Sequence, residues 1–182
     1  LIIYGHTSSI ADGIDAYFGS LMKILPSLKR LIHTDADLKD AKRLSSERTT
    51  SLHAWGSVWY APSIIFRLWR PQVSDLTREF SWLIRRSIIH ENSTAALATN
   101  SWQIHCQLRF LALNKPKIIL WPWENHPWER ELCRMAKKLG VKTLGYQHAV
   151  IGPHQYNTSP ASNPDGLESI PERVICSGPA YY

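Results

Sequence analysis

The sequence has little cysteine and no closely spaced cysteine pair. Its 3 cysteines, Cys106, Cys133 and Cys176, stand far apart in apolar surroundings. A disulfide framework or a zinc site would need cysteines at short, paired spacing. The sequence therefore predicts buried thiols in a reducing compartment, which favours the cytoplasm.

Long apolar runs and basic blocks are missing as well. No stretch approaches the roughly 18 consecutive apolar residues that a transmembrane helix needs. The net charge is +6, but Lys and Arg occur singly or in pairs. Without a basic block or a recognisable binding motif, a nucleic acid is not an indicated partner. The positive charge fits an anionic membrane surface or a negatively charged substrate.

Two glycine-rich nucleotide signatures are absent. No G-x-G-x-x-G follows the first apolar run and no P-loop is present, which argues against a dehydrogenase and a P-loop kinase. The 182 residues, 44% of them hydrophobic, suit one globular domain. The chain begins with Leu1 instead of methionine and ends just after an apolar run, so we expect further sequence on both sides.

Apolar runs alternate along the chain with segments of helical spacing. Strands are predicted over 1–4, 28–33, 118–121, 142–146 and 173–177, and helices over 14–25, 74–90, 93–113 and 127–139, with a surface helix or loop over 35–48. Pro127 at the start and Lys137-Lys138 at the end support the last helix. The alternation predicts an α/β fold with a Rossmann-like parallel sheet flanked by helices.

Residues 54–69, AWGSVWYAPSIIFRLW, are unusually aromatic and contain Pro62. Aromatic residues at helical spacing usually pack inside, so a core helix is the first interpretation. Two alternatives are an acceptor-binding surface and a patch that lies on a membrane, with Arg67 and Arg70 facing lipid phosphates. Further on, Pro, Asn, Ser and Gly predict a long loop over 152–171.

The residues most suited to chemistry follow two strands of one predicted βαβ unit. Strand 118–121 is followed by Trp123, Glu124 and Asn125, and strand 142–146 by Gln147 and His148. A right-handed crossover makes such strands parallel, and ligands of open α/β sheets bind beyond the carboxyl ends. We therefore expect Glu124 and His148 to open onto one hollow, which His6 after the first strand also borders.

These residue types indicate a carbohydrate ligand. Tryptophan offers flat apolar area to a sugar ring, and carboxylates and amides bind its hydroxyls. The substrate-binding candidates are Trp123, Asn125, Glu129, Gln147, His6 and, on the first loop, Asp15. Helix-start carboxylates are a simpler explanation for Glu129 and Glu131, and core packing is one for Trp121 and Trp128. His126 and His154 are assigned no role, and no metal ligands are indicated.

The segment WENHPWERELCRMAKKLGVKTLGYQHAVI, residues 123–151, resembles bacterial surface-carbohydrate biosynthesis proteins of the glycosyltransferase type. Those proteins show aromatic-Glu-Asn-x-Pro-Trp-Glu, a helix, and Lys-Thr-x-Gly-Tyr-Gln-His with a small residue. IPERVICSG, residues 170–178, and DAYFGSL, residues 15–21, are similar to other parts of the family. The clear match covers about a third of the chain. Ala149 is a departure, because many Gln-His motifs of capsule enzymes carry glycine there.

The resemblance implies a GT-B type enzyme with two Rossmann-like halves and a cleft between them. Residues 1–172 would form the N-terminal, acceptor-side domain, and residues 173–182 would begin the C-terminal domain or the crossover to it. The implied activity is transfer of a sugar from a nucleotide-activated donor to a carbohydrate acceptor, in capsule or O-antigen synthesis. It implies no cofactor and no essential metal. The implied place is the cytoplasm, at the inner face of the membrane, and this chain alone would be inactive.

Glu124 or His148 is the expected general base if the transfer inverts configuration. The histidine after a strand resembles the polyol-phosphate polymerases, whereas a carboxylate is the usual base elsewhere. In a retaining enzyme, Glu124 would instead steady the developing positive charge. Two further functions stay open: a nucleotide-sugar epimerase of GT-B type, and a non-catalytic carbohydrate-binding or scaffold module.

Overall fold

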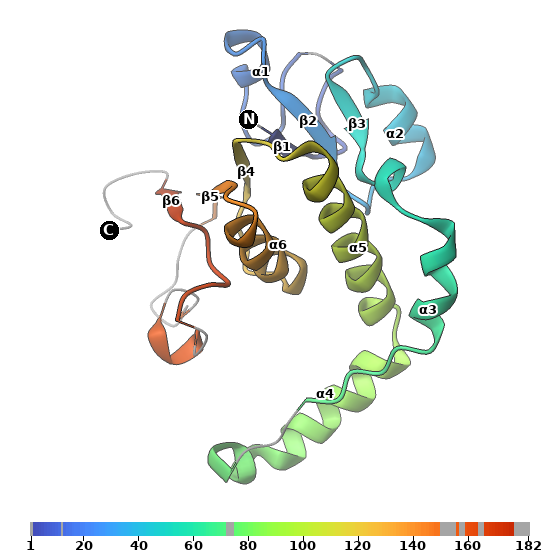
Figure 1. Cartoon of the computed structure of the whole chain (residues 1–182), viewed down its shortest axis with the longest axis vertical. Helices are drawn as coiled ribbons and strands as arrows, with labels where there is room; N and C mark the ends of the chain where they lie inside the picture. The colour runs from blue at the N-terminus through green and yellow to red at the C-terminus, as the bar shows by residue number, and fades with distance from the viewer. Residues whose placement is uncertain are drawn as a thin grey trace.

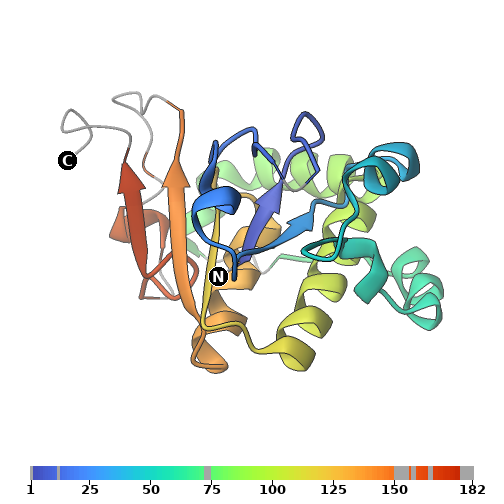
Figure 2. The same ribbon diagram turned by 90° about the horizontal axis from the view of Figure 1, so that it is seen from above.

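A parallel β-sheet organises the chain. The computed structural model describes residues 2–11, 13–71, 75–149, 156, 159–163 and 166–176. Within them, six strands form one sheet in the order β3-β2-β1-β4-β5-β6. They are β1 (Ile2–Gly5), β2 (Lys29–Ile32), β3 (Thr49–Ser51), β4 (Ile118–Pro122), β5 (Lys142–Gln147) and β6 (Arg173–Cys176). Figure 2 shows them side by side, from red β6 through orange β5 to blue β2.

This order is that of a Rossmann fold, and it confirms the predicted Rossmann-like parallel sheet. The reversal point lies between β1 and β4, where Ile2 pairs with Lys29 on one side and with Ile119 on the other. The central strand β4 is apolar on both faces because both are covered. Trp121 is buried in the larger core cluster and Leu120 in a second cluster on the opposite face.

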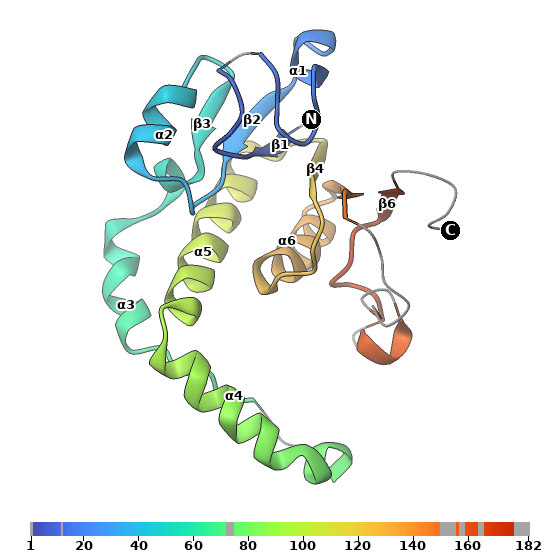
Figure 3. The ribbon, with the colours of Figure 1, turned by 180° about the vertical axis from the view of Figure 1, so that it is seen from behind.

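Helices flank both faces of the sheet. They are α1 (Leu21–Ile24), α2 (Leu38–Leu44), α3 (Ala61–Ile65), α4 (Ser81–Ser93), α5 (Ala96–Asn114) and α6 (Pro127–Lys138), with 3-10 turns at Leu52–Trp55, Val58–Tyr60, Asp75–Phe80 and Pro160–Ser162. In Figures 1 and 3, α5 and α6 lie below the strands and α1 lies above them. The larger core fills the space between the sheet and α5 and α6.

The predicted helix over 14–25 is wrong in its first half. Only Leu21–Ile24 is helical, and Asp15 and Gly19 instead close a tight turn through an antiparallel bridge. The Asp15 carboxylate accepts the backbone N–H groups of Tyr17 and Phe18, at 3.0 and 3.2 Å. Gly19 has a φ of 55°, which glycine tolerates and a helix does not. Local hydrogen bonding thus overrides the helical spacing of the apolar residues.

The same turn contains a buried ion pair. Arg30 on β2 lies 3.3 Å from Asp15, and both side chains are fully buried. Arg30 also donates to the Ile10 carbonyl at 3.0 Å, and Ser9 donates its hydroxyl to Asp15 at 3.1 Å. Hydrogen bonds of this kind offset the cost of burying the charge pair, although Nε of Arg30 has no partner among the described residues. The ion pair ties the loop after β1 to β2, next to the reversal point of the sheet.

The core-helix interpretation of residues 54–69 is also wrong. The segment is broken into the 3-10 turn at 58–60 and the short helix α3, and neither has a buried residue. We define the arm as residues 58–93, from Val58 through α4. Within it, α3 lies beside α5, and α4 projects beyond the lower end of α5 in Figures 1 and 3. The stacking of Tyr60 on His105, at 3.8 Å between ring centroids, ties its base to α5.

The last third of the chain follows the predicted order of elements. β4, α6 and β5 form a βαβ unit, and Arg173–Cys176 adds β6 to the same sheet. The boundary expected at residue 173 therefore coincides with a strand of the first unit, and residues 177–182 lie outside the described residues. No helix in the described ranges combines the length and apolar character that a membrane crossing requires.

Candidate functional site

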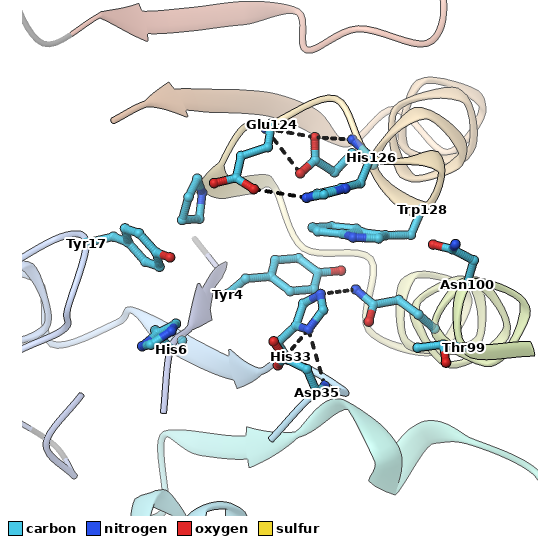
Figure 4. A pocket seen from close by; sticks show the side chains of 14 residues that line it. Tyr4, His6, Tyr17, His33, Asp35, Thr99, Asn100, Glu124, His126 and Trp128 are labelled. Carbon is cyan, nitrogen blue, oxygen red and sulfur yellow. Dashed lines mark hydrogen bonds and ion pairs between the residues drawn. The ribbon is translucent and has the colours of Figure 1, made fainter. Parts of the chain in front are cut away.

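A cavity of about 330 Å³ opens at the reversal point of the strand order. Its walls come from the carboxyl ends of β1, β2 and β4, the first turns of α5 and the start of α6. Strands on either side of such a point send their connections to opposite faces, which leaves a crevice where α/β proteins bind ligands. Its volume is within the range of small-ligand sites. Figure 4 shows the side chains that converge on it.

Glu124 lies on the rim of this cavity between two imidazole rings. Its carboxylate is 2.9 Å from Nε2 of His126 and 3.2 Å from Nε2 of His148. Parallel pairing of β4 with β5, continued by the Trp123 N–H that donates to the Tyr146 carbonyl at 2.9 Å, brings the two strand ends together. The predicted closeness of Glu124 and His148 is therefore confirmed. The expectation that both open onto one hollow is wrong for His148, because only Glu124 lines the cavity. The catalytic role of both residues stays a prediction.

The loop that carries Glu124 is shaped by Glu129 of α6. The Glu129 side chain is almost fully buried and accepts the backbone N–H groups of Glu124, Asn125 and His126. Asn125 adopts a φ of 65°, a left-handed conformation that asparagine tolerates better than most residues. These contacts turn the chain sharply after β4 and direct the Glu124 side chain to the rim. Glu129 therefore acts as the helix-start carboxylate.

Burial raises the pKa of Glu129 to about 7, although three donated N–H groups favour its charged form. Between its ordinary pKa of 4.5 and about 7, the folded protein holds a proton that the unfolded chain has released. Raising the pH through this window should then lower the free energy of unfolding, by roughly 2–3 kcal/mol for a shift of this size. Urea unfolding at the two ends of the window measures the difference. In Glu129→Gln the pH dependence should shrink, and an unchanged dependence would contradict the assignment.

Aromatic rings form the floor of the cavity. Tyr4 and Trp128 lie 5.3 Å apart between ring centroids, and His33 packs against Trp128 at 5.1 Å. Burial raises the pKa of Tyr4 well above its ordinary value, so its hydroxyl stays neutral. This hydroxyl is buried and has no hydrogen-bond partner among the described residues. A buried polar group without a partner at a cavity wall is suited to a ligand hydroxyl.

A second set of polar side chains lines the cavity near the end of β2. His33 follows β2 and contacts Asp35 at 2.8 Å and the Gln103 amide at 2.7 Å. The hydrogen bond from His33 lowers the pKa of Asp35, so this carboxylate is ionised at neutral pH. None of these three residues was predicted from the sequence. Glu124 was selected because polar residues just after a strand border the ligand edge of the sheet. The same criterion applied to β2 would have selected His33 and Asp35. No local sequence pattern indicates Gln103 on α5.

Several predicted substrate ligands are placed elsewhere. Trp123 is buried in the larger core cluster, because the side chain packs on Gly145 of β5, and it presents no face to the cavity. Asp15 is enclosed by its ion pair and backbone donors, so a substrate cannot reach it. Gln147 is half-buried, contacts the Ala149 carbonyl at 3.5 Å and does not line the cavity. Asn125 shapes the loop, and its side-chain oxygen accepts from Arg130 at 3.4 Å.

His6 does border the cavity, as predicted from its position after β1. Its ring packs edge-on against Tyr17 at 5.5 Å, and Tyr17 in turn contacts His148 at 4.9 Å. Tyr17 thus joins the loop after β1 to the Glu124 cluster. His126 was assigned no role from its sequence position, but it lines the cavity and contacts Glu124. His154 lies outside the described residues.

Among the described residues, no lysine or arginine lines the cavity. Its charged groups are the carboxylates of Asp35, Glu124 and Glu129, and its other polar groups are imidazoles, amides and hydroxyls. Within the described part of the chain, no group of three or more His, Cys, Asp or Glu side chains is arranged to hold a metal ion. The wall is thus better suited to a neutral ligand rich in hydroxyl groups than to a phosphate.

Comparison with known proteins gives no relative for this chain: no family matches its sequence, and neither a curated protein nor a solved structure is significantly similar.

Proposed function

We propose that this chain is the acceptor-side half of a GT-B type glycosyltransferase, which transfers a sugar from a nucleotide-activated donor to a carbohydrate acceptor of the bacterial surface. The observation that carries the proposal is the Glu124 carboxylate, held by His126 at 2.9 Å and His148 at 3.2 Å on the rim of a cavity at the strand reversal. Glycosyl transfer requires such a group, because an acceptor hydroxyl must lose its proton as it attacks.

The geometry favours Glu124 over His148 as the base. Glu124 lines the cavity and is about half exposed, whereas His148 does not line it, and the buried Nδ1 of His148 has no hydrogen-bond partner among the described residues. An N–H on Nε2 of each histidine can donate to the carboxylate, which fixes its two oxygens in place. In this proposal Glu124 takes the proton of the acceptor hydroxyl, and His126 and His148 are positioning residues.

The cavity wall supports an acceptor in preference to the donor. A nucleotide diphosphate needs cationic or backbone N–H groups, and no lysine or arginine in the described part of the chain lines the wall. Tyr4 and Trp128 offer apolar ring surface, and Thr99 and Asn100 of α5 offer groups that bind hydroxyls. The donor phosphates would then be bound by a second Rossmann-like domain that faces this edge, as in the GT-B arrangement.

Product analysis of the full-length protein tests the proposal. The protein is incubated with a panel of nucleotide sugars, with and without a bacterial surface glycan as acceptor. Release of nucleotide that depends on the glycan, with growth of the glycan by one sugar, is the expected result. Conversion of the nucleotide sugar without acceptor would identify an epimerase. Glycan binding without any turnover would instead identify a binding module, and either outcome would contradict the proposal.

A further inference from the structure

The arm, residues 58–93, exposes a set of large apolar side chains that no other part of the described chain covers. Among these, Trp59 is 88% exposed, Phe66 83% and Trp82 62%. Further members are Val58, Ile65, Leu68, Phe80, Leu83 and Ile89. Single exposed apolar residues are ordinary, but this many on one segment indicate an interaction surface.

Helix α4 lacks the packing that normally stabilises a helix. It runs over Ser81–Ser93 and buries none of its residues. An isolated helix of this length is marginal in water, because tertiary packing normally provides most of its stability. The side chain of Asn92 fixes the arm internally, since it accepts the Trp69 N–H at 2.7 Å and donates to the Trp69 carbonyl at 3.2 Å. The arm thus holds its shape while its apolar side chains face outward.

Positively charged side chains outnumber negatively charged ones in the arm. Its sequence holds 5 arginines and no lysine, against 3 carboxylates. Among the side chains that the structure describes, none forms an ion pair with Arg70, Arg85 or Arg86. Arg85 and Arg86 line a surface hollow on α4 together with Trp82 and Ile89. Unpaired guanidinium groups and aromatic rings therefore share one face of this helix.

We propose that the arm docks on an anionic lipid bilayer. Its tryptophans and phenylalanines would lie among the headgroups, where aromatic rings are favoured, and Arg85 and Arg86 would bind lipid phosphates. A protein partner could also cover apolar area, but it would not explain unpaired arginines that flank interfacial aromatics on the same face. An anionic bilayer explains both features: its headgroups attract the arginines, and its interface favours the aromatic rings.

The proposal does not depend on catalysis by Glu124. It does bear on the cavity, because α4 leads directly into α5, whose first turns carry Thr99, Asn100 and Gln103 of the cavity wall. A docked arm would hold the mouth of the cavity close to the membrane surface.

Vesicle flotation tests the proposal with the full-length protein. We expect it to float with vesicles of phosphatidylcholine and phosphatidylglycerol, and far less with phosphatidylcholine alone. An arginine near an anionic surface contributes roughly fivefold to binding, so Arg85→Gln with Arg86→Gln should weaken it by about 25-fold. Added salt should weaken it too. The matched control, Lys138→Gln with Lys142→Gln, removes two exposed charges away from the arm and should change binding less than about twofold.

The apolar contribution is tested by Phe66→Ser with Trp82→Ser. Both residues are exposed, so the variant should keep its circular dichroism spectrum and lose binding to anionic vesicles. Equal binding to neutral and anionic vesicles, or equal losses in the arm and control variants, would overturn the proposal. A protein that does not float with vesicles, but forms a dimer in light scattering that Phe66→Ser disrupts, would also overturn the proposal. A second copy of the chain would then cover the exposed apolar side chains of the arm.

Discussion

Replacement of Glu124 by glutamine should lower kcat of the full-length protein by about 10²- to 10⁴-fold, the usual contribution of a general base. Glutamine keeps the size of the side chain and an oxygen that can accept from His126 or His148, but it cannot take a proton. Because Glu124 is about half exposed, its loss should leave the thermal unfolding temperature nearly unchanged. The measurement is turnover of nucleotide sugar with acceptor present, alongside a melting curve of each variant.

Substitutions of the two histidines that contact Glu124 distinguish catalysis from positioning. His148→Asn and His126→Asn should each lower kcat by a smaller factor than Glu124→Gln. Combining either with Glu124→Gln should cost little more than Glu124→Gln alone, because residues that act as one unit are not additive. A variant with the same chemical change but no contact with the cavity is Glu131→Gln, whose carboxylate pairs with Arg134 at 3.5 Å on the surface of α6.

Turnover within about twofold of the wild type in both Glu124→Gln and His148→Asn would remove the basis for catalysis at this edge, since a general base contributes far more. The carbohydrate-binding module would then be the better explanation of the same aromatic and polar wall.

The largest loss of stability should come from Asp15→Asn. This change leaves Arg30 charged, fully buried and without its counter-ion, which costs about 3–5 kcal/mol of the free energy of unfolding. Asparagine still offers one oxygen to the Tyr17 and Phe18 N–H groups, so the loss comes from the contacts of the other oxygen, with Arg30 and Ser9. Urea unfolding followed by circular dichroism measures it.

The exposed ion pair of Glu131 with Arg134 also provides the control for Asp15→Asn. Glu131→Gln removes a carboxylate from Arg134 where both side chains are about one third exposed, so solvent screens the pair. Its loss should cost at most about 1 kcal/mol. Equal losses in the two variants would show that Asp15 contributes through local hydrogen bonds alone and that its charge is unimportant.

The order of elements could be predicted from the sequence because each signal is local. The apolar runs at 118–121 and 142–146 mark buried strands, and Pro127 with the lysines near residue 138 marks the helix between them. The turn at 15–19 and the break in residues 54–69 could not be predicted this way. In both, apolar residues recur at helical spacing, but a buried Asp15–Arg30 pair decides the first, and in the second the 3-10 turn at 58–60 and α3 bury none of their residues.

The candidate site was predictable in part. The sequence placed Glu124 and His148 after parallel strands, and the βαβ geometry brought them within 3.2 Å. It also placed Trp123, Asn125 and Gln147 after the same strands. Which of these face the cavity depends on how the chain turns after β4, and that turn is made by Glu129 and the left-handed Asn125. Sequence spacing carries no information about that turn.

By itself, the sequence determined the α/β alternation, the βαβ unit and the convergence of Glu124 with His148, because hydrophobic period and crossover handedness are properties of short segments. Only the tertiary structure decided that β1 and β4 are neighbours, since their pairing joins residues more than a hundred positions apart. That pairing sets the strand reversal, brings His33, Asp35 and Gln103 to the cavity and leaves the arm outside the core. Contacts between distant segments depend on the packing of the whole sheet, which no local pattern encodes.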